Sequence, residues 1–232
     1  MKIKNKLEHN RNINFFFNRL YNLFFGEKFR KKISYNFRKN ISRTDLILYS
    51  INKRNFNSYL EIGCYDDFVF SKVNLVEKVG VDPNSGGNYR ATSDNFFSQN
   101  KKNFDCIFID GLHEYNQVIK DIKNSLKVLN ENGLIFLHDC LPESVGRQRV
   151  PRDRYTWNGD VWKAIVEART WKNCDTKTCL IDHGISIIEK KPNQDPLEIK
   201  TTEFKKLKFK FFYENYEKLM RTESYKDTIK NI

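Results

Sequence analysis

Short apolar runs alternate with helical periodicities across the middle of the chain. The runs typical of buried strands are residues 58–62, 78–81, 104–109 and 134–137. Apolar residues from Tyr115 to Leu129 recur at helical spacing, and Asn132-Gly133 is expected to stop that helix before the next strand. Ser42 or Thr44 is suited to cap an earlier helix that runs to about Arg54. This alternation predicts an α/β domain with a mainly parallel, Rossmann-like sheet.

The pattern changes after residue 160. Residues 160–169 are expected to be helical, and two strand-like runs follow at 178–181 and 185–189. His183-Gly184 separates them so tightly that the two strands must be antiparallel. The sheet is therefore expected to end in an antiparallel hairpin.

The two ends of the chain differ from the middle. We divide it into a basic, Phe-rich helical extension (1–43), the α/β domain (44–190) and a C-terminal helical extension (191–232), whose residues 204–220 are expected to form a helix. No apolar run approaches the ~20 residues that a membrane span needs. The Phe-rich face could pack on the domain, form a contact in a homo-oligomer, or lie on an anionic membrane surface.

Charge is concentrated in these extensions. The chain carries a net charge of +12, of which residues 1–43 hold 12 basic and 2 acidic residues, whereas residues 44–199 hold 20 and 22. A nucleic-acid enzyme would more often be basic on its catalytic domain, so a nucleic-acid partner is not favoured. The five cysteines are odd in number and show no CxxC spacing, which indicates a reduced, cytoplasmic protein without a disulfide framework or zinc site.

Acidic residues gather where the predicted strands end. Ligands bind beyond the carboxyl ends of strands in open α/β sheets. Asp82 lies 19 positions after Gly63, a spacing that suits a carboxylate binding ribose hydroxyls, and Gly63 would let a ligand approach the backbone. The GxGxxG fingerprint is absent, and Glu61 favours a cationic or amine-bearing ligand. A nucleoside with an amino-acid tail meets these conditions.

At this point the sequence resembles class I S-adenosylmethionine-dependent methyltransferases, in particular the bacterial branch associated with sugar, glycan and natural-product O-methylation. The resemblance covers about residues 57–190 and rests on Tyr-Leu-Glu-Ile-Gly, Val-Gly-Val-Asp-Pro, Thr-Ser-Asp-Asn-Phe-Phe, Phe-Ile-Asp-Gly-Leu-His-Glu-Tyr, Leu-His-Asp-Cys-Leu-Pro and Trp-Asn-Gly-Asp-Val-Trp-Lys. It implies that Glu61, Gly63 and Cys64 line the methionine moiety, that Asp82 holds the ribose and that Ser93 and Asp94 lie near the adenine. Tyr65, Pro83 and Asp110 complete the implied donor site. Tyr65, Asp66 and Asp67 stand where such enzymes usually have further glycines.

Four side chains are expected to converge on the acceptor side: Asp110, His113, His138 and Asp139. The resemblance implies that His113 is the general base and that Asp110, His138 and Asp139 bind Mg²⁺. A histidine among these ligands suits a hard cation less well than oxygen does. From the residues alone, His113 could also serve only to orient a loop through Asp110.

An arginine-rich loop follows the 134–137 strand. Arg147, Arg149 and Arg152 lie close together and, with Trp157, are expected to bind an anionic acceptor carrying phosphate or carboxylate. A solvated loop or a subunit contact is the alternative.

These observations favour an O-methyltransferase that uses S-adenosylmethionine, with or without Mg²⁺, to modify a sugar or other small polar metabolite in polysaccharide or natural-product biosynthesis. An RNA methyltransferase that uses the basic extensions, or a NAD-linked sugar oxidoreductase, is the alternative.

Overall fold

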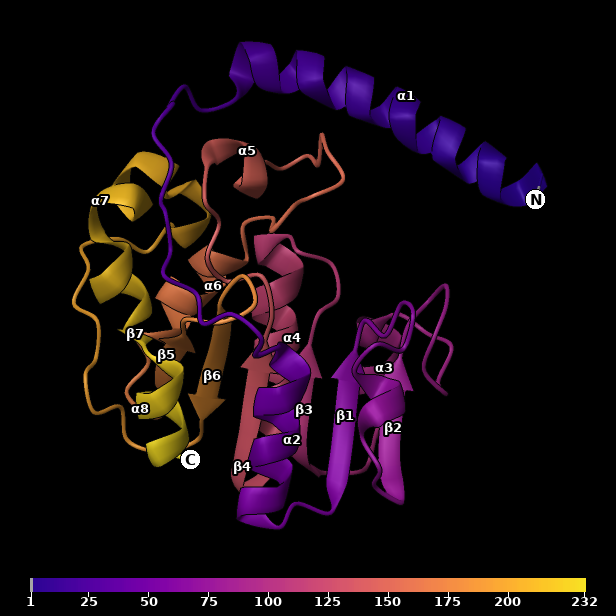
Figure 1. Cartoon of the computed structure of the whole chain (residues 1–232), viewed down its shortest axis with the longest axis vertical. Coiled ribbons are helices and arrows are strands. Elements are labelled where there is room, and N and C mark those ends of the chain that lie inside the picture. The colour runs from indigo at the N-terminus through magenta and orange to yellow at the C-terminus, as the bar shows by residue number, and fades with distance from the viewer. Residues whose placement is uncertain (1) are drawn as a thin grey trace.

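A seven-stranded sheet forms the centre of the computed structural model, which describes residues 2–232 and the side chains from residue 12 onward. The strand order is β2-β1-β3-β4-β6-β5-β7 (Figure 1). The strands are β1 (Ser58–Ile62), β2 (Glu77–Val81), β3 (Phe104–Ile109), β4 (Leu129–Leu137), β5 (Asp175–Cys179), β6 (Ile185–Glu189) and β7 (Thr222–Glu223).

Strand direction confirms the predicted fold class. β2, β1, β3 and β4 run parallel, whereas β6 pairs antiparallel with both β4 and β5. The β5–β6 hairpin turns through Asp182, His183 and Gly184, all at positive φ, and β5 begins three residues earlier than expected. The sheet is therefore mainly parallel and closes in an antiparallel hairpin, the Rossmann-like arrangement of class I methyltransferases.

Helices cover both faces of this sheet. They are α1 (Lys2–Phe25), α2 (Arg43–Arg54), α3 (Ser93–Gln99), α4 (Tyr115–Val128), α5 (Val145–Gln148), α6 (Val161–Ala168), α7 (Phe209–Met220) and α8 (Tyr225–Lys230), with short 3₁₀ turns at Phe70–Lys72 and Phe204–Lys206. Ser42 caps α2 in a reciprocal capping box with Asp45.

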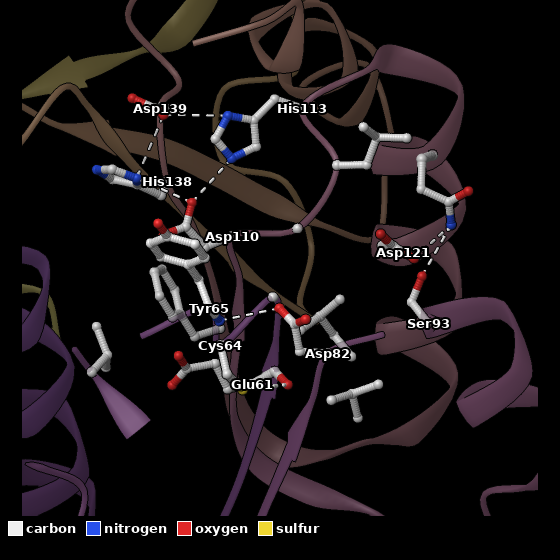
Figure 2. Close-up of a pocket in the computed structure, with 18 of the residues that line it drawn as sticks. Glu61, Cys64, Tyr65, Asp82, Ser93, Asp110, His113, Asp121, His138 and Asp139 are labelled. Atoms are coloured by element: carbon white, nitrogen blue, oxygen red, sulfur yellow. Dashed lines mark hydrogen bonds and ion pairs between the residues drawn. The ribbon is translucent and has the colours of Figure 1, made fainter. Parts of the chain in front are cut away.

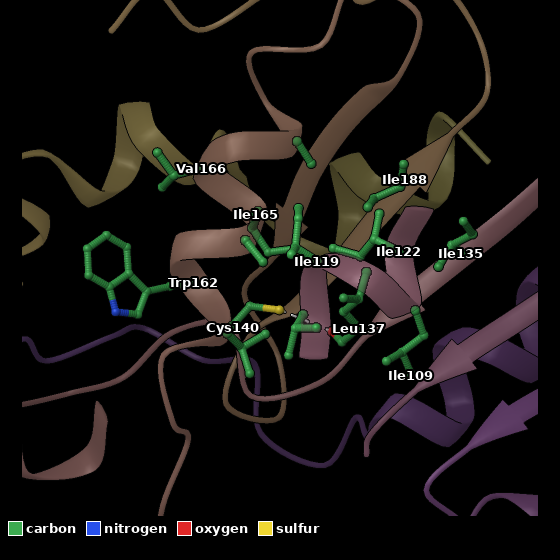
Figure 3. Packing of buried hydrophobic residues seen from close by; sticks show 14 of the residues in the cluster. Ile109, Ile119, Ile122, Ile135, Leu137, Cys140, Trp162, Ile165, Val166 and Ile188 are labelled. Atoms are coloured by element: carbon green, nitrogen blue, oxygen red, sulfur yellow. Dashed lines mark hydrogen bonds between the residues drawn. The ribbon is translucent and has the colours of Figure 1, made fainter. Parts of the chain in front are cut away.

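Alternate strand residues face two separate cores. In β3, Ile107 and Ile109 pack under α4 and α6, while Cys106 and Phe108 pack under α2. Figure 3 shows the first core, where Ile119 and Ile122 of α4 meet Ile165 of α6 above the sheet. Successive strand side chains point to opposite faces, so strands covered on both sides must be apolar throughout. All five cysteines lie in described, buried positions and are unpaired.

The α4–β4 boundary corrects one prediction. α4 ends at Val128 and β4 begins at Leu129, so Asn132-Gly133 lies inside the strand and does not stop the helix. Asn132 adopts φ 62°, and a Cβ on Gly133 would lie 2.8 Å from the Asp105 carbonyl oxygen. The pair therefore permits an irregular start to β4, which could not be distinguished from a helix stop in the sequence.

The C-terminal segment is packed into the fold. β7 pairs parallel with β5, and α7 buries Phe209 and Phe212 against α6, where the ring of Phe212 lies 4.6 Å from that of Trp162. The predicted helix at 204–220 is thus a 3₁₀ turn followed by α7. The proposed division of the chain at residue 190 stays a prediction.

The N-terminal segment forms one long helix followed by an extended stretch. α1 lies across the end of the molecule toward which β1, β3 and β4 point (Figure 1). Residues 26–42 then run along α7, where the ring of Phe29 lies 5.2 Å from that of Tyr213. Of the phenylalanines in the described part of α1, only Phe15 is buried, so its Phe-rich face does not pack on the domain. No helix among the described residues is long and apolar enough to cross a membrane.

We expect Phe212→Ala to destabilise the whole α/β domain. The substitution removes a fully buried ring from the α6–α7 contact, which should lower the free energy of unfolding by about 3–5 kcal/mol. Urea denaturation followed by far-UV circular dichroism measures this, with Lys210→Ala on the exposed side of α7 as control. An unchanged midpoint for Phe212→Ala would show that α7 is not part of the same cooperative unit.

Candidate functional site

One large cavity opens at the carboxyl ends of the parallel strands. Its volume is about 940 Å³, enough for a nucleoside-sized ligand and a small second molecule. Nearly all residues predicted for donor, acceptor or metal line it: Glu61, Gly63, Cys64, Tyr65, Asp82, Pro83, Ser93, Asp94, Asp110, His113, His138, Asp139, Arg147, Arg152 and Trp157. Only Arg149 does not.

The cavity has two halves: Gly63 and Asp82 lie in the first, and His113 and Asp139 lie in the second. Strand register brings these halves together. The Asp110 N–H donates to the Ile62 carbonyl, and the His138 N–H donates to the Ile109 carbonyl, so the residues after β1, β3 and β4 stand level. Gly63 adopts φ 90°, and a Cβ there would lie 2.4 Å from the Asp110 carbonyl oxygen. Only glycine fits this close approach of β1 to β3.

Asp82 organises the loops around the first half. Its Oδ2 accepts the Tyr65 N–H at 3.1 Å (Figure 2). Its Oδ1 accepts the backbone N–H groups of Asn84 and Ser85 at 2.8 and 2.9 Å. Arg90 lies 3.8 Å away. These bonds fix the carboxylate at the end of β2 where a ribose carboxylate was predicted.

Glu61 lies in β1, between the neighbouring strands β2 and β3, and its carboxyl group is buried. Its side chain accepts a hydrogen bond from the Tyr59 hydroxyl at 2.5 Å. Burial, with the negative charge of Asp110, raises the pKa of Glu61 to about 8, although the Tyr59 bond opposes the shift. The group is thus largely protonated at neutral pH, and a cation placed beside it would favour its ionised form.

A second buried carboxyl lies at the far end of this half. Asp121 of α4 accepts a hydrogen bond from Gln117, whose amide also reaches Ser93 and Asp94 (Figure 2). Burial raises the pKa of Asp121 to about 6. Gln117 and Asp121 also line the cavity, so both lie beside Ser93 and Asp94, where the adenine ring of a nucleoside was expected.

The second half of the cavity centres on a histidine held between two carboxylates. His113 Nε2 lies 3.0 Å from Asp110 Oδ1, and Nδ1 lies 3.3 Å from Asp139 Oδ2 (Figure 2). Burial lowers the pKa of His113, but the Asp110 hydrogen bond and the charge of Asp139 outweigh it, so its pKa is raised. Both ring nitrogens can donate only in the imidazolium form.

His138 repeats this arrangement one layer deeper. Its Nδ1 lies 3.2 Å from Asp110 and its Nε2 lies 3.5 Å from Asp182. Burial opposes protonation, yet the charges of Asp110 and Asp139 raise the pKa of His138 to about 10. Arg43 adds an ion pair with Asp182 at 3.0 Å. Among the described residues three carboxylates therefore share one guanidinium and two imidazoles.

The segment 157–160 covers His113 from above. The Trp157 ring stacks on the imidazole at 5.7 Å between centroids, and Asn158 donates to Asp139 at 2.8 Å. A Cβ on Gly159 would lie 1.8 Å from the His113 carbonyl oxygen, so glycine is required there. The Trp-Asn-Gly-Asp motif thus fixes both the base candidate and its carboxylate partner.

The donor set does not suit magnesium. Asp110, His113 and Asp139 present potential ligand atoms within 4.8 Å of one another, and His138 adds a second imidazole. Mg²⁺ prefers oxygen ligands in octahedral geometry, whereas mixed imidazole and carboxylate sets suit transition metals. The ring nitrogens of His113 are also both directed at carboxylates.

The arginine loop corrects another prediction. Arg149 pairs with the fully buried Asp153 at 3.0 Å and accepts the Trp157 indole N–H on its carbonyl oxygen, so its guanidinium faces away from the cavity. Arg147 and Arg152 do line the cavity. A buried carboxylate needs a cationic partner, and spacing alone does not show which arginine supplies it.

Some residues in or beside the cavity were not identified in the sequence. Asp182, which pairs with Arg43 and His138, follows the apolar Ile181 just as Asp110 follows β3, so the strand-end rule could have been extended to the hairpin turn. Asn158 lies inside a motif that was noted without a role. Arg43 is the first residue of α2, where nothing local indicates that it turns toward Asp110 and Asp182.

Comparison with known proteins agrees with this geometry. Residues 60–140, from β1 to just beyond β4, match the family model of a methyltransferase domain. This part of the chain is therefore similar to a methyltransferase domain. No curated protein has a sequence that matches the chain.

Several solved structures share the fold of this chain. A protein described as a caffeoyl-CoA O-methyltransferase from Staphylococcus aureus is 18% identical, with 82% of this chain and 98% of that chain covered at a TM-score of 0.50. The S-adenosylhomocysteine-bound methyltransferase PaMTH1 from Podospora anserina is 17% identical, covering 64% of this chain and 78% of that chain at 0.49. The fold is that of class I S-adenosylmethionine-dependent methyltransferases.

We expect Glu61→Gln to stabilise the ligand-free protein at alkaline pH. The folded pKa of about 8 exceeds the unfolded value near 4.5, so the favourable contribution of Glu61 is complete at low pH and is lost as pH rises from 4.5 to 8. Gln cannot ionise and can still accept the Tyr59 hydrogen bond.

The gain over wild type should therefore grow by roughly 3–5 kcal/mol between pH 5 and pH 8.5. Urea unfolding at the two pH values measures it, and Glu77→Gln on the exposed start of β2 is the control. A gain independent of pH would contradict a buried, protonated Glu61.

Proposed function

We propose that the chain is an S-adenosylmethionine-dependent O-methyltransferase whose acceptor is a small, hydroxyl-bearing metabolite such as a sugar. The observation that carries this proposal is His113, held between Asp110 and Asp139 in the same cavity as the Gly63–Asp82 half. A base next to a nucleoside-sized subsite is what transfer to a hydroxyl requires.

The first half of the cavity would bind the donor. Asp82 would accept hydrogen bonds from ribose hydroxyls, and Gln117 with Asp121 would face the base of the nucleoside. Glu61 would meet the cationic amino-acid tail, and its ionisation would then balance that charge. S-adenosylmethionine supplies an electrophilic methyl group on a sulfonium.

His113 would take the proton of the acceptor. Because Nε2 makes the shorter contact with Asp110, we assign Nδ1 as the nitrogen that receives the hydroxyl proton, with Asp139 beside it. The oxygen forms a bond to the methyl carbon as the carbon–sulfur bond breaks toward sulfur. Asp110 and Asp139 stabilise the imidazolium that results.

Arg147 and Arg152, at the rim of the cavity, favour an anionic group on the acceptor. Surface polysaccharide or natural-product biosynthesis would supply such sugars. We also propose that the protein is cytoplasmic, since five unpaired buried cysteines suit a reducing compartment. We propose further that it forms a homo-oligomer. RNA and NAD are not favoured, because carboxylates form the floor of the cavity and the glycine fingerprint is absent.

Calorimetric titration of the protein with S-adenosylhomocysteine and, separately, NAD tests the donor. We expect micromolar binding of the former and none of NAD. Asp82→Asn should weaken binding on the order of tenfold, since an amide accepts hydrogen bonds less strongly than a carboxylate. Lack of S-adenosylhomocysteine binding to folded protein would remove the proposed function.

Rate against pH tests the base. Methyl transfer should rise with pH and reach half its plateau above pH 6.5, because the raised pKa of His113 keeps it protonated at lower pH. His113→Gln should lower the rate on the order of 10²-fold or more while leaving S-adenosylhomocysteine binding intact.

Asp139→Asn is the sharper variant. It removes the carboxylate beside Nδ1, so the midpoint of the profile should move to lower pH. Asn tolerates the positive φ of 58° at this position. A profile that does not move would assign the pH dependence to another group.

A further inference from the structure

The exposed face of α1 is apolar. Ile13, Phe16, Phe17, Leu20 and Phe24 recur at helical spacing and form one stripe of the helix. Phe16, Phe17 and Phe24 are 57, 61 and 72% exposed. We call these five residues the Phe face. Such a contiguous exposed apolar surface indicates a binding partner.

The opposite side of α1 attaches the helix to the protein, and it is mainly polar. The Asn18 and Asn22 amides donate to the carbonyl oxygens of Arg152 and Pro151 at 2.7 and 3.1 Å, and Arg19 donates to the Asp153 carbonyl at 3.1 Å. Amphipathic helices normally turn their apolar side inward. Here hydrogen bonds to the 151–153 loop hold the Phe face outward.

The charge around the Phe face selects among partners. The helix that carries it, α1 (Lys2–Phe25), holds five basic residues and one acidic residue, and the whole of residues 1–43 holds 12 and 2. A symmetric contact with a second copy would bring two such segments together, and their like charges would repel. An anionic lipid surface instead offers negative headgroups to the basic residues and an acyl boundary to the aromatic rings.

α1 lies at the same end of the molecule as the cavity. The helix lies across the end toward which β1, β3 and β4 point (Figure 1), and the loop that it holds contributes Arg152 and Tyr155 to the cavity lining. A surface bound by the Phe face would therefore lie on the same end of the molecule as the cavity.

We infer that α1 is an interfacial helix that docks the chain on an anionic lipid surface through the Phe face. The helix lies in the plane of that surface and does not cross it. This inference does not depend on the chemistry of the cavity, and its test does not use methyl transfer.

Flotation of the full-length protein with lipid vesicles provides the test. We expect binding to vesicles of equimolar phosphatidylcholine and phosphatidylglycerol, weaker binding to phosphatidylcholine alone, and release by high salt. The triple variant Phe16→Ser, Phe17→Ser and Phe24→Ser should lose binding on the order of tenfold or more. Val76→Ser, a fully exposed apolar residue in the loop before β2, is the matched control and should bind as wild type does.

Light scattering after size-exclusion chromatography tests the alternative that the Phe face binds a second copy of the chain. A wild-type dimer that the triple variant converts to monomer, without vesicle binding by either protein, would overturn the proposal and assign the Phe face to a second copy. Vesicle binding that the triple variant retains would also overturn it. The thermal midpoint of the triple variant should equal that of wild type, because the docked side of α1 is unchanged.

Discussion

Asp110 is the residue on which the functional end of the sheet depends. Its carboxylate is largely removed from water at the point where β1, β3 and β4 end, and there it needs positive partners. His113, His138 and Arg43 supply them at 3.0, 3.2 and 3.8 Å. The interaction holds the pKa of Asp110 well below its usual range despite burial, so the group stays ionised. Each partner comes from a different segment, so the Asp110 carboxylate connects the loop before α4, the end of β4 and the start of α2.

The two halves of the cavity treat buried carboxyls in opposite ways. Glu61 has only the Tyr59 hydroxyl as a close partner, so burial dominates and its pKa rises to about 8. Asp110, at the end of the neighbouring strand β3, is surrounded by cations and its pKa falls. Pairs of acids with pKa values pushed apart are typical of sites that divide binding and proton transfer between groups. The protonated Glu61 can accommodate an incoming cation, while the ionised Asp110 stabilises an imidazolium.

Local sequence patterns were sufficient where one physical rule acted alone. Residues 104–109 and 185–189 are strands as predicted because both runs are apolar and bounded by turns. The strand-end rule found Asp82, Asp110 and Asp139, since parallel strands deliver their ends to one edge. The predictions failed where distant segments decide. Asn132-Gly133 has the composition of a helix stop, yet its contacts with Asp105 make it part of β4. Arg149 is equivalent to Arg147 by composition, and only the buried Asp153 separates their roles.

The orientation of α1 follows the same logic. Helical spacing shows that Phe16, Phe17 and Leu20 share one side, but spacing cannot show which side meets the protein. That choice is made by unpaired backbone carbonyl groups of the 151–153 loop, which accept the Asn18, Arg19 and Asn22 donors. Backbone carbonyl groups of a loop need hydrogen-bond partners where they are shielded from water, and the polar side of α1 supplies them here. The contact that leaves the Phe face outward is therefore also a contact with the loop at the rim of the cavity, which couples the surface helix to the shape of that cavity.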